Sequence, residues 1–150
     1  MEKKYVVGID IGGQSAKIGV VDARGEVLAQ TVVVSNKHTV AQEFVDYLSQ
    51  AVLALIKQAD VEGQVRGIGV GAPDGNYYTG EIEGAMNITW CGKETIPFAA
   101  MLSKATGIPV SLTNDANAAA VGEMTYGAAR GMKNFIMITL GTGVGSGIVI

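Results

Sequence analysis

Histidine and cysteine are almost absent from this chain, because His38 and Cys91 are the only residues of their types among 150. A single cysteine excludes an internal disulfide, and one cysteine with one histidine cannot form the four-ligand sets of structural zinc sites. Chemistry within these residues is therefore expected to rest on carboxylates, amides, hydroxyls, Lys and Arg side chains and the backbone.

Positive charge and long apolar runs are also scarce. The chain carries 11 Lys and Arg against 14 Asp and Glu, a formal net charge of −3, so it lacks the basic patch by which proteins bind nucleic acids or acidic membranes. The long apolar runs, such as residues 5–9 and 135–140, are far shorter than the ~20 residues of a membrane-spanning helix. Asp10 interrupts the first run before it reaches signal-peptide length. We therefore expect a cytoplasmic protein with no nucleic-acid partner and no membrane segment.

Glycine is plentiful: it makes up 21 of the 150 residues, about twice the ~7% share of an average protein. Three predicted strands, 4–11, 16–22 and 26–35, are rich in Val and Ile and separated by turns that contain glycine. The first turn, Gly-Gly-Gln-Ser at 12–15, leads directly into another strand. A dinucleotide-binding Rossmann site needs a helix after such a turn, so the pattern argues against that site.

The rest of the chain alternates helices and strands. A helix is predicted over 39–60, with Thr39 and Gln42 at the spacing of a capping box. The further predicted elements are a strand at 64–71, a loop at 72–76, a hairpin about 77–80, a helix at 96–106, a strand at 109–113, an alanine-rich helix at 114–126, and strands at 134–140 and 144–150.

The end of the chain repeats the pattern of its beginning. Residues 4–22 and 134–150 each contain an apolar strand, a turn with glycine and a small polar residue, and a second strand punctuated by glycine. This similarity suggests a weak internal duplication. We expect residues 1–131 to form one lobe with a connecting helix, and residues 132–150 to begin a second, incomplete lobe in a chain that is truncated.

Five segments in this order resemble one known family. They are 8–22 with a first phosphate motif, 69–75 with a sugar loop, Asn-Ile-Thr-Trp at 87–90, Asn-Asp-Ala-Asn-Ala-Ala-Ala-Val-Gly-Glu at 114–123, and 139–150 with a second phosphate motif. The chain resembles the ribonuclease H-like fold of the actin, Hsp70 and hexokinase superfamily and, within it, the ROK family of bacterial sugar kinases and repressors. The resemblance implies an α/β, actin-like ATPase fold: a mixed five-stranded sheet with flanking helices, then the first hairpin of a second similar lobe.

The resemblance also implies an activity and a catalytic residue. It implies an ATP-dependent kinase that phosphorylates the 6-hydroxyl of a hexose, glucose above all, with Asp115 as the general base. Asn114 would bind a ring hydroxyl, and Asp74, Gly75 and Asn87 would line the sugar side. From the residues alone, the favoured interpretation of Asn114 and Asp115 is the N-terminal cap of a helix.

A phosphate-binding set follows from the same resemblance. Glycines in the two turns would let backbone N–H groups approach phosphate oxygens, and Asp10 would hold Mg²⁺ through water. Asp10 could instead satisfy the amides of its own turn. The implied ATP-binding residues are Asp10, Gly12, Gly13, Gln14, Ser15, Lys17, Gly141, Thr142, Gly143 and Gly145.

Two positions depart from the family pattern, and three interpretations stay open. Gln14 stands where a hydroxyl is usual, which Ser15 could replace, and Asp74 stands where glycine is usual. Trp90 could be an apolar platform for the sugar or a core residue. The alternatives to a glucokinase are a sugar-sensing regulator, a non-catalytic sugar-binding homologue, or a kinase for N-acetylmannosamine, fructose or allose. The resemblance further implies a homodimer at full length and a structural zinc site beyond residue 150.

Overall fold

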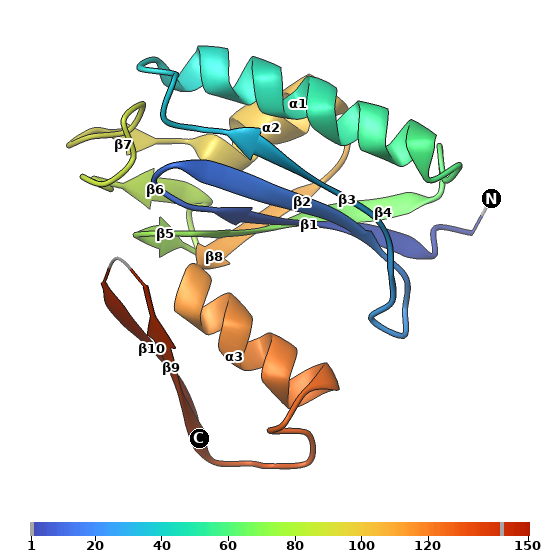
Figure 1. The fold of residues 1–150 in the computed structure, drawn as a ribbon, viewed down its shortest axis with the longest axis vertical. Coiled ribbons are helices and arrows are strands. Elements are labelled where there is room, and N and C mark those ends of the chain that lie inside the picture. Colours follow the sequence, from blue (N-terminus) through green and yellow to red (C-terminus); the bar gives the residue numbers. More distant parts are fainter. Residues whose placement is uncertain (1, 142) are drawn as a thin grey trace.

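A mixed five-stranded sheet forms the centre of the molecule. The computed structural model describes residues 2–141 and 143–150. The strand order is β3-β2-β1-β4-β8 (Figure 1), in which β1 pairs antiparallel with β2 and parallel with β4. The strand bounds are β1 Tyr5–Ile11, β2 Ser15–Val21, β3 Val27–Val34, β4 Val65–Ala72 and β8 Val110–Asn114. The predicted mixed sheet is thus confirmed, with strand ends within two residues of the sequence-based bounds.

Two helices, α1 (Ala41–Gln58) and α2 (Phe98–Thr106), cover one face of this sheet, and α3 (Asp115–Tyr126) lies on the other side (Figure 1). The core fills the space between the sheet and the first two helices, where Phe44, Leu48 and Phe98 are fully buried. Each such side chain contributes about 1.5–3 kcal/mol of transfer free energy. No helix in the described parts of the chain is both long and apolar enough to cross a membrane.

The beginning of α1 differs from the prediction. Val40 occupies the N-cap with extended backbone, and no side chain caps the helix. Gln42 donates from Nε2 to Oδ1 of Asp46 at 2.8 Å instead of reaching back to Thr39. The predicted capping box is therefore wrong. The helix depends on its buried apolar face, because tertiary packing supplies most of the stability of a helix in a protein.

A small three-stranded sheet follows the carboxyl end of β4. It consists of β5 Gly75–Asn76, β6 Glu81–Glu83 and β7 Thr95–Ile96, in the order β5-β6-β7. The predicted hairpin about 77–80 is confirmed, since β5 and β6 pair antiparallel across it. Asn76 Oδ1 accepts hydrogen bonds from the backbone N–H of Tyr78 at 2.9 Å and of Thr79 at 3.4 Å. These bonds fix the turn that presents two tyrosines.

The last two strands, β9 (Phe135–Leu140) and β10 (Val144–Val149), form a separate antiparallel hairpin beside α3 (Figure 1). Glycine permits this contact. A Cβ atom on Gly147 would lie 2.6 Å from Cβ of Ala120 and 2.7 Å from the carbonyl oxygen of Ala116. The alanine-rich face of α3 and the glycines of β10 therefore let helix and strand approach more closely than larger side chains would.

Candidate functional site

A cavity of about 920 Å³ lies between the open face of the sheet and α3, within the size range of small-molecule sites. Its floor is nearly bare because three glycines stand in register on neighbouring strands: Gly8 pairs with Gly19 on one side and with Gly69 on the other. A Cβ atom on Gly8 or Gly69 would find no atom within 4 Å. The sequence shows these glycines, but only strand register shows that they make one surface.

Two residues after Gly8 on β1, polar side chains lie near the carboxyl ends of the parallel strands. Asp10 pairs with Lys17 on β2 and with Gly71 on β4. A Cβ atom on Gly71 would lie 3.5 Å from Cα of Asp115, and neighbouring strands lie only ~4.8 Å apart. Asp10, Lys17 and Asp115 all line the same cavity. Three of the predicted site residues, distant in sequence, therefore share one wall.

The junction between β8 and α3 holds both Asn114 and Asp115. Asn114 is the N-cap, and its Oδ1 accepts from the backbone N–H of Ala116 at 3.0 Å and of Asn117 at 3.4 Å. Asp115 Oδ1 also accepts from the N–H of Ala116, at 2.9 Å. The capping interpretation is confirmed. It leaves the side-chain N–H donors of Asn114 and the second carboxylate oxygen of Asp115 available to a ligand, so the proposed roles are compatible with the cap.

The loop after β4 explains the unusual residue at position 74. Asp74 has a φ of +52°, in the left-handed region where Gly, Asn and Asp are the residues normally tolerated. Its carbonyl oxygen accepts from the N–H of Glu83 at 3.0 Å. Gly75 follows, and a Cβ atom there would lie 2.7 Å from the carbonyl oxygen of Thr113. Aspartate thus keeps the backbone shape of a glycine while adding a carboxyl group.

Trp90 does not face the cavity. Its side chain is 3% exposed, and its ring stacks on Phe44 at 4.6 Å and on Phe98 at 5.5 Å between centroids. Its Nε1 donates to Oγ of Ser35 at 3.2 Å, and this hydroxyl donates to the carbonyl oxygen of Gly12 at 3.4 Å. The sugar-platform interpretation is wrong, and the core interpretation is confirmed.

The first glycine turn is held by its own hydrogen bonds. The Gly12 N–H donates to the carbonyl oxygen of Ser15 at 2.9 Å, and the carbonyl oxygen of Gln14 accepts from the N–H of Ser35 at 2.9 Å. A Cβ atom on Gly13 would lie 2.7 Å from the carbonyl oxygen of Asn87. The structure thus accounts for Gly13 by its packing against the segment that carries Asn87. The phosphate roles of this turn stay predictions.

The second glycine turn is more open. The Gly141 N–H donates to the carbonyl oxygen of Gly143 at 2.9 Å, and a Cβ atom on either glycine would meet nothing within 4 Å. A Cβ atom on Gly145 would lie 2.6 Å from Oγ1 of Thr139, which gives that glycine a packing role as well. Thr142, also predicted to bind phosphate, lies outside the described residues.

The predicted site residues fall into three groups, according to whether they line the main cavity, a smaller hollow or neither. Among the described residues, Asp10, Lys17 and Asp115 line the main cavity, and Asp74 and Gly75 line a smaller hollow beside it. The predicted residues that line neither space are Gly12, Gly13, Gln14, Ser15, Asn87, Asn114, Gly141, Gly143 and Gly145.

A magnesium ion can fit this site only with help from a ligand. Within residues 2–141 and 143–150 there is no group of three or more His, Cys, Asp or Glu side chains that could hold a metal ion. Mg²⁺ in nucleotide sites keeps several waters and takes one or two carboxylates together with phosphate oxygens. Asp10, an exposed carboxyl group on the cavity wall, suits that mode and does not suit a cage built from protein alone.

Comparison with known proteins points to one family. The ROK family profile matches residues 6–150. A glucokinase from Halalkalibacterium halodurans is 37% identical over 154 residues, an alignment that covers 99% of this chain and 45% of that protein. The crystal structure of a ROK family glucokinase from Streptomyces griseus in complex with glucose and AMPPNP is 37% identical, with a TM-score of 0.77 over 97% of this chain and 44% of that one.

A ROK hexokinase from Thermus thermophilus is 35% identical, with a TM-score of 0.79 over 97% of this chain and 47% of that one. The chain therefore spans slightly less than half the length of these relatives.

Proposed function

The chain belongs to the ROK family. From this membership we propose that the whole protein is an ATP-dependent kinase that phosphorylates the 6-hydroxyl of a hexose, with glucose as its main substrate. The observation that carries the proposal is Asp115, a carboxylate at the start of α3 on the wall of a cavity that also presents Asp10 and Lys17. Glucokinases are among the proteins that the chain resembles. Membership of the ROK family itself is shown by the profile match over residues 6–150.

In the proposed reaction, Asp115 removes the proton of the sugar 6-hydroxyl. The oxygen then forms a bond to the γ-phosphorus of ATP, the bond between that phosphorus and the β,γ-bridging oxygen breaks, and ADP leaves with the electron pair. A carboxylate in this role must lie ~2.6–3.2 Å from the hydroxyl oxygen. The cap bond from Ala116 to Oδ1 holds the carboxylate in place, and the N-terminus of α3 stabilises its negative charge.

On the same proposal, the main cavity receives the phosphates near Asp10 and Lys17. Lys17 offers a positive charge to phosphate oxygens, and Asp10 would hold Mg²⁺ through water. The ion, when bound, would offset the charge of the polyphosphate during transfer. A cytoplasmic location belongs to the proposal, because ATP is supplied there.

A coupled assay of ADP release tests this proposal. The protein expressed from its complete reading frame is supplied with MgATP and with glucose, fructose, N-acetylmannosamine or allose in turn. We expect ADP release that depends on sugar and is fastest with glucose. ADP release with one of the other sugars but not with glucose would overturn the substrate assignment. Sugar binding without ADP release for any of them would instead support the regulator or the non-catalytic homologue.

A further inference from the structure

Ser35, directly after β3, carries one of the two polar side chains that are buried among the described residues. It is 0% exposed, and the other, Ser49 on α1, is 6% exposed. A buried hydroxyl needs hydrogen-bond partners, because a polar group left unpaired away from water costs free energy. Ser49 finds its partner within α1, where its Oγ donates to the carbonyl oxygen of Asp46 at 2.8 Å. Ser35 instead bonds to two segments that are distant in the sequence.

Ser35 donates two hydrogen bonds to the first glycine turn, residues 12–15. Its backbone N–H donates to the carbonyl oxygen of Gln14 at 2.9 Å, and its hydroxyl donates to the carbonyl oxygen of Gly12 at 3.4 Å. The N–H of Asn36 also donates to the carbonyl oxygen of Gln14, at 3.3 Å. The carbonyl groups of the turn are therefore held by the chain that follows β3.

The N–H groups of the same turn stay free. Within residues 2–141 and 143–150, the N–H groups of Gly13 and Gln14 donate to no protein acceptor, and two successive free N–H groups form a concavity that favours anions. The carbonyl group of Gly12 and the N–H of Gly13 belong to one planar trans peptide unit. The bond from Ser35 to that carbonyl oxygen thus fixes the direction in which the N–H of Gly13 points.

The Ser35 hydroxyl is itself oriented by Trp90, whose Nε1 donates to Oγ at 3.2 Å. A hydroxyl carries a single proton, so an oxygen that accepts from the indole keeps that proton for the carbonyl oxygen of Gly12. The indole is fixed in turn by stacking on Phe44 and Phe98. The orientation of the hydroxyl therefore comes from the aromatic core.

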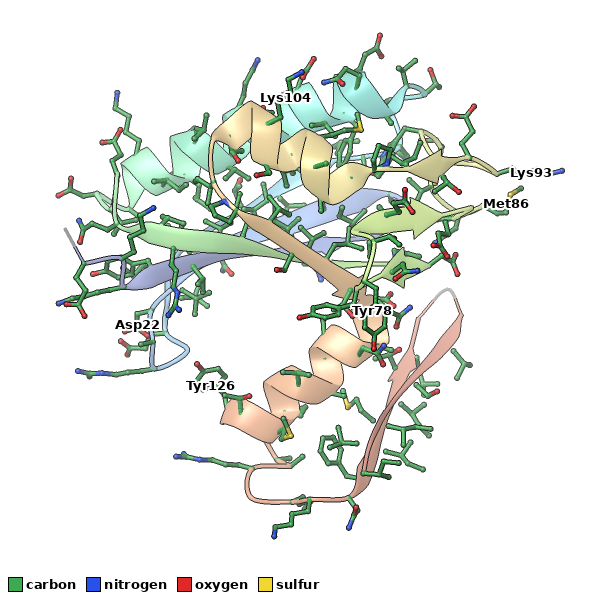
Figure 2. The ribbon with its side chains drawn as sticks, turned by 180° about the vertical axis from the view of Figure 1, so that it is seen from behind. Asp22, Tyr78, Met86, Lys93, Lys104 and Tyr126 are labelled. Carbon is green, nitrogen blue, oxygen red and sulfur yellow. The ribbon has the colours of Figure 1, made fainter. Side chains whose placement is uncertain are left out.

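The segment 87–90, which carries this indole, also contacts the turn directly. Met86 before the segment and Lys93 after it point away from the molecule (Figure 2). The carbonyl oxygen of Asn87 instead lies so close to Gly13 that a Cβ atom on that glycine would be 2.7 Å away. One segment therefore supports the turn twice, by this contact and through the serine hydroxyl.

We propose that Ser35 is a positioning residue for phosphoryl transfer, whose hydroxyl holds the N–H of Gly13 toward the phosphate groups of ATP. The inference rests on the proposed kinase function and on the predicted phosphate role of the first glycine turn. It adds a residue that lines neither the main cavity nor the smaller hollow, so Ser35 acts through the turn and not by touching a substrate. Loss of its hydroxyl should weaken ATP binding while the sugar side stays unchanged.

Steady-state kinetics with MgATP and glucose test the role of Ser35. The complete protein is compared with Ser35→Ala and with the control Ser49→Ala, which removes the other buried hydroxyl. We expect Ser35→Ala to raise the KM for MgATP about three- to tenfold, the effect of one neutral hydrogen bond, with no change in the KM for glucose. Ser49→Ala should leave both KM values as in the wild type.

Trp90→Phe gives a second route to the same hydroxyl, because it removes the indole donor and keeps Ser35. Combined with Ser35→Ala, it should raise the KM for MgATP no further than Ser35→Ala alone, since both changes act through one hydroxyl. A double variant in which the two effects multiply would overturn the proposed chain of contacts.

Three results would overturn the positioning role and leave the kinase function intact: an unchanged KM for MgATP in Ser35→Ala, an equal rise in Ser49→Ala, or a lower kcat with both KM values unchanged. No ADP release by the wild type with any hexose would overturn the proposed function itself. Calorimetry with MgATP would then decide on Ser35. Binding that is weaker in Ser35→Ala than in Ser49→Ala supports the positioning role, and equal binding overturns it.

Discussion

Trp90 and Asp74 show what single residues reveal only in three dimensions. A lone tryptophan in a loop is more often a core anchor than a sugar platform. Its place in the core depends on Phe44 and Phe98, which are distant in sequence yet stack on it. Asp74 departs from the family pattern, and its φ of +52° shows why aspartate is a workable substitute for glycine. By contrast, the cap at Asn114 was predictable, because the side chain of a cap bonds to backbone two and three residues away.

Trp90→Phe tests the core role of the indole. The change removes the N–H that donates to the buried Ser35 hydroxyl, and we expect the free energy of unfolding to fall by about 1–3 kcal/mol. The KM for the sugar should not change, since Trp90 lines neither the cavity nor the hollow among the described residues. Urea denaturation and steady-state kinetics measure the two effects. A raised sugar KM at unchanged stability would contradict this assignment.

At the scale of elements, periodicity and glycine turns predicted the order and type of every long helix and strand. The start of α1 was mispredicted because Thr39 and Gln42 have the spacing of a capping box, whereas the chain folds with Val40 at the cap and Gln42 bonded to Asp46. The bare floor of the cavity could not be predicted at all, since it depends on the register that aligns Gly8 with Gly19 and Gly69. The motifs named candidate residues for the site, but the shape of the cavity depends on strand register.

The contact between α3 and β10 depends on glycine, and a pair of substitutions can test it. Gly147→Ala places a methyl group against Ala116 and Ala120, so we expect a loss of about 1–3 kcal/mol in the free energy of unfolding, as for other overpacked sites. Gly122 is an exposed position of α3 with open space around it. Gly122→Ala should instead raise the free energy of unfolding by up to about 1 kcal/mol, because alanine has the higher helix propensity. Equal effects of the two changes on thermal unfolding would contradict the packing role of Gly147.

At the scale of the whole molecule, the chain spans slightly less than half the length of its kinase relatives. Its main cavity is bounded by the sheet and α3, and the β9–β10 hairpin presents an outer face of exposed apolar residues, among them Ile136, Ile138 and Leu140. A kinase site must exclude water and surround both substrates during transfer. On the proposed function, residues 1–150 would carry one wall of such a site.

We therefore expect the 150-residue chain by itself to release no ADP above background, even at saturating glucose and MgATP. The complete protein, assayed at the same concentration, provides the control. Circular dichroism of the short chain shows whether its helices and strands are formed when activity is measured. Sugar-dependent turnover by the 150 residues alone would contradict the view that they hold only part of the site.

The role of Asp115 is the most direct test of the account, and the substitution Asp115→Asn in the complete protein measures it. The cap of α3 should persist, because Asn114 supplies it, so glucose binding measured by calorimetry should stay close to that of the wild type. We predict that kcat for ADP release falls by about 10²–10⁴-fold, the contribution typical of a general base. Asp60→Asn, an exposed residue after α1 whose positive φ asparagine also tolerates, should retain full activity. A kcat for Asp115→Asn equal to that of Asp60→Asn would contradict the central claim that Asp115 is the base of a hexose kinase.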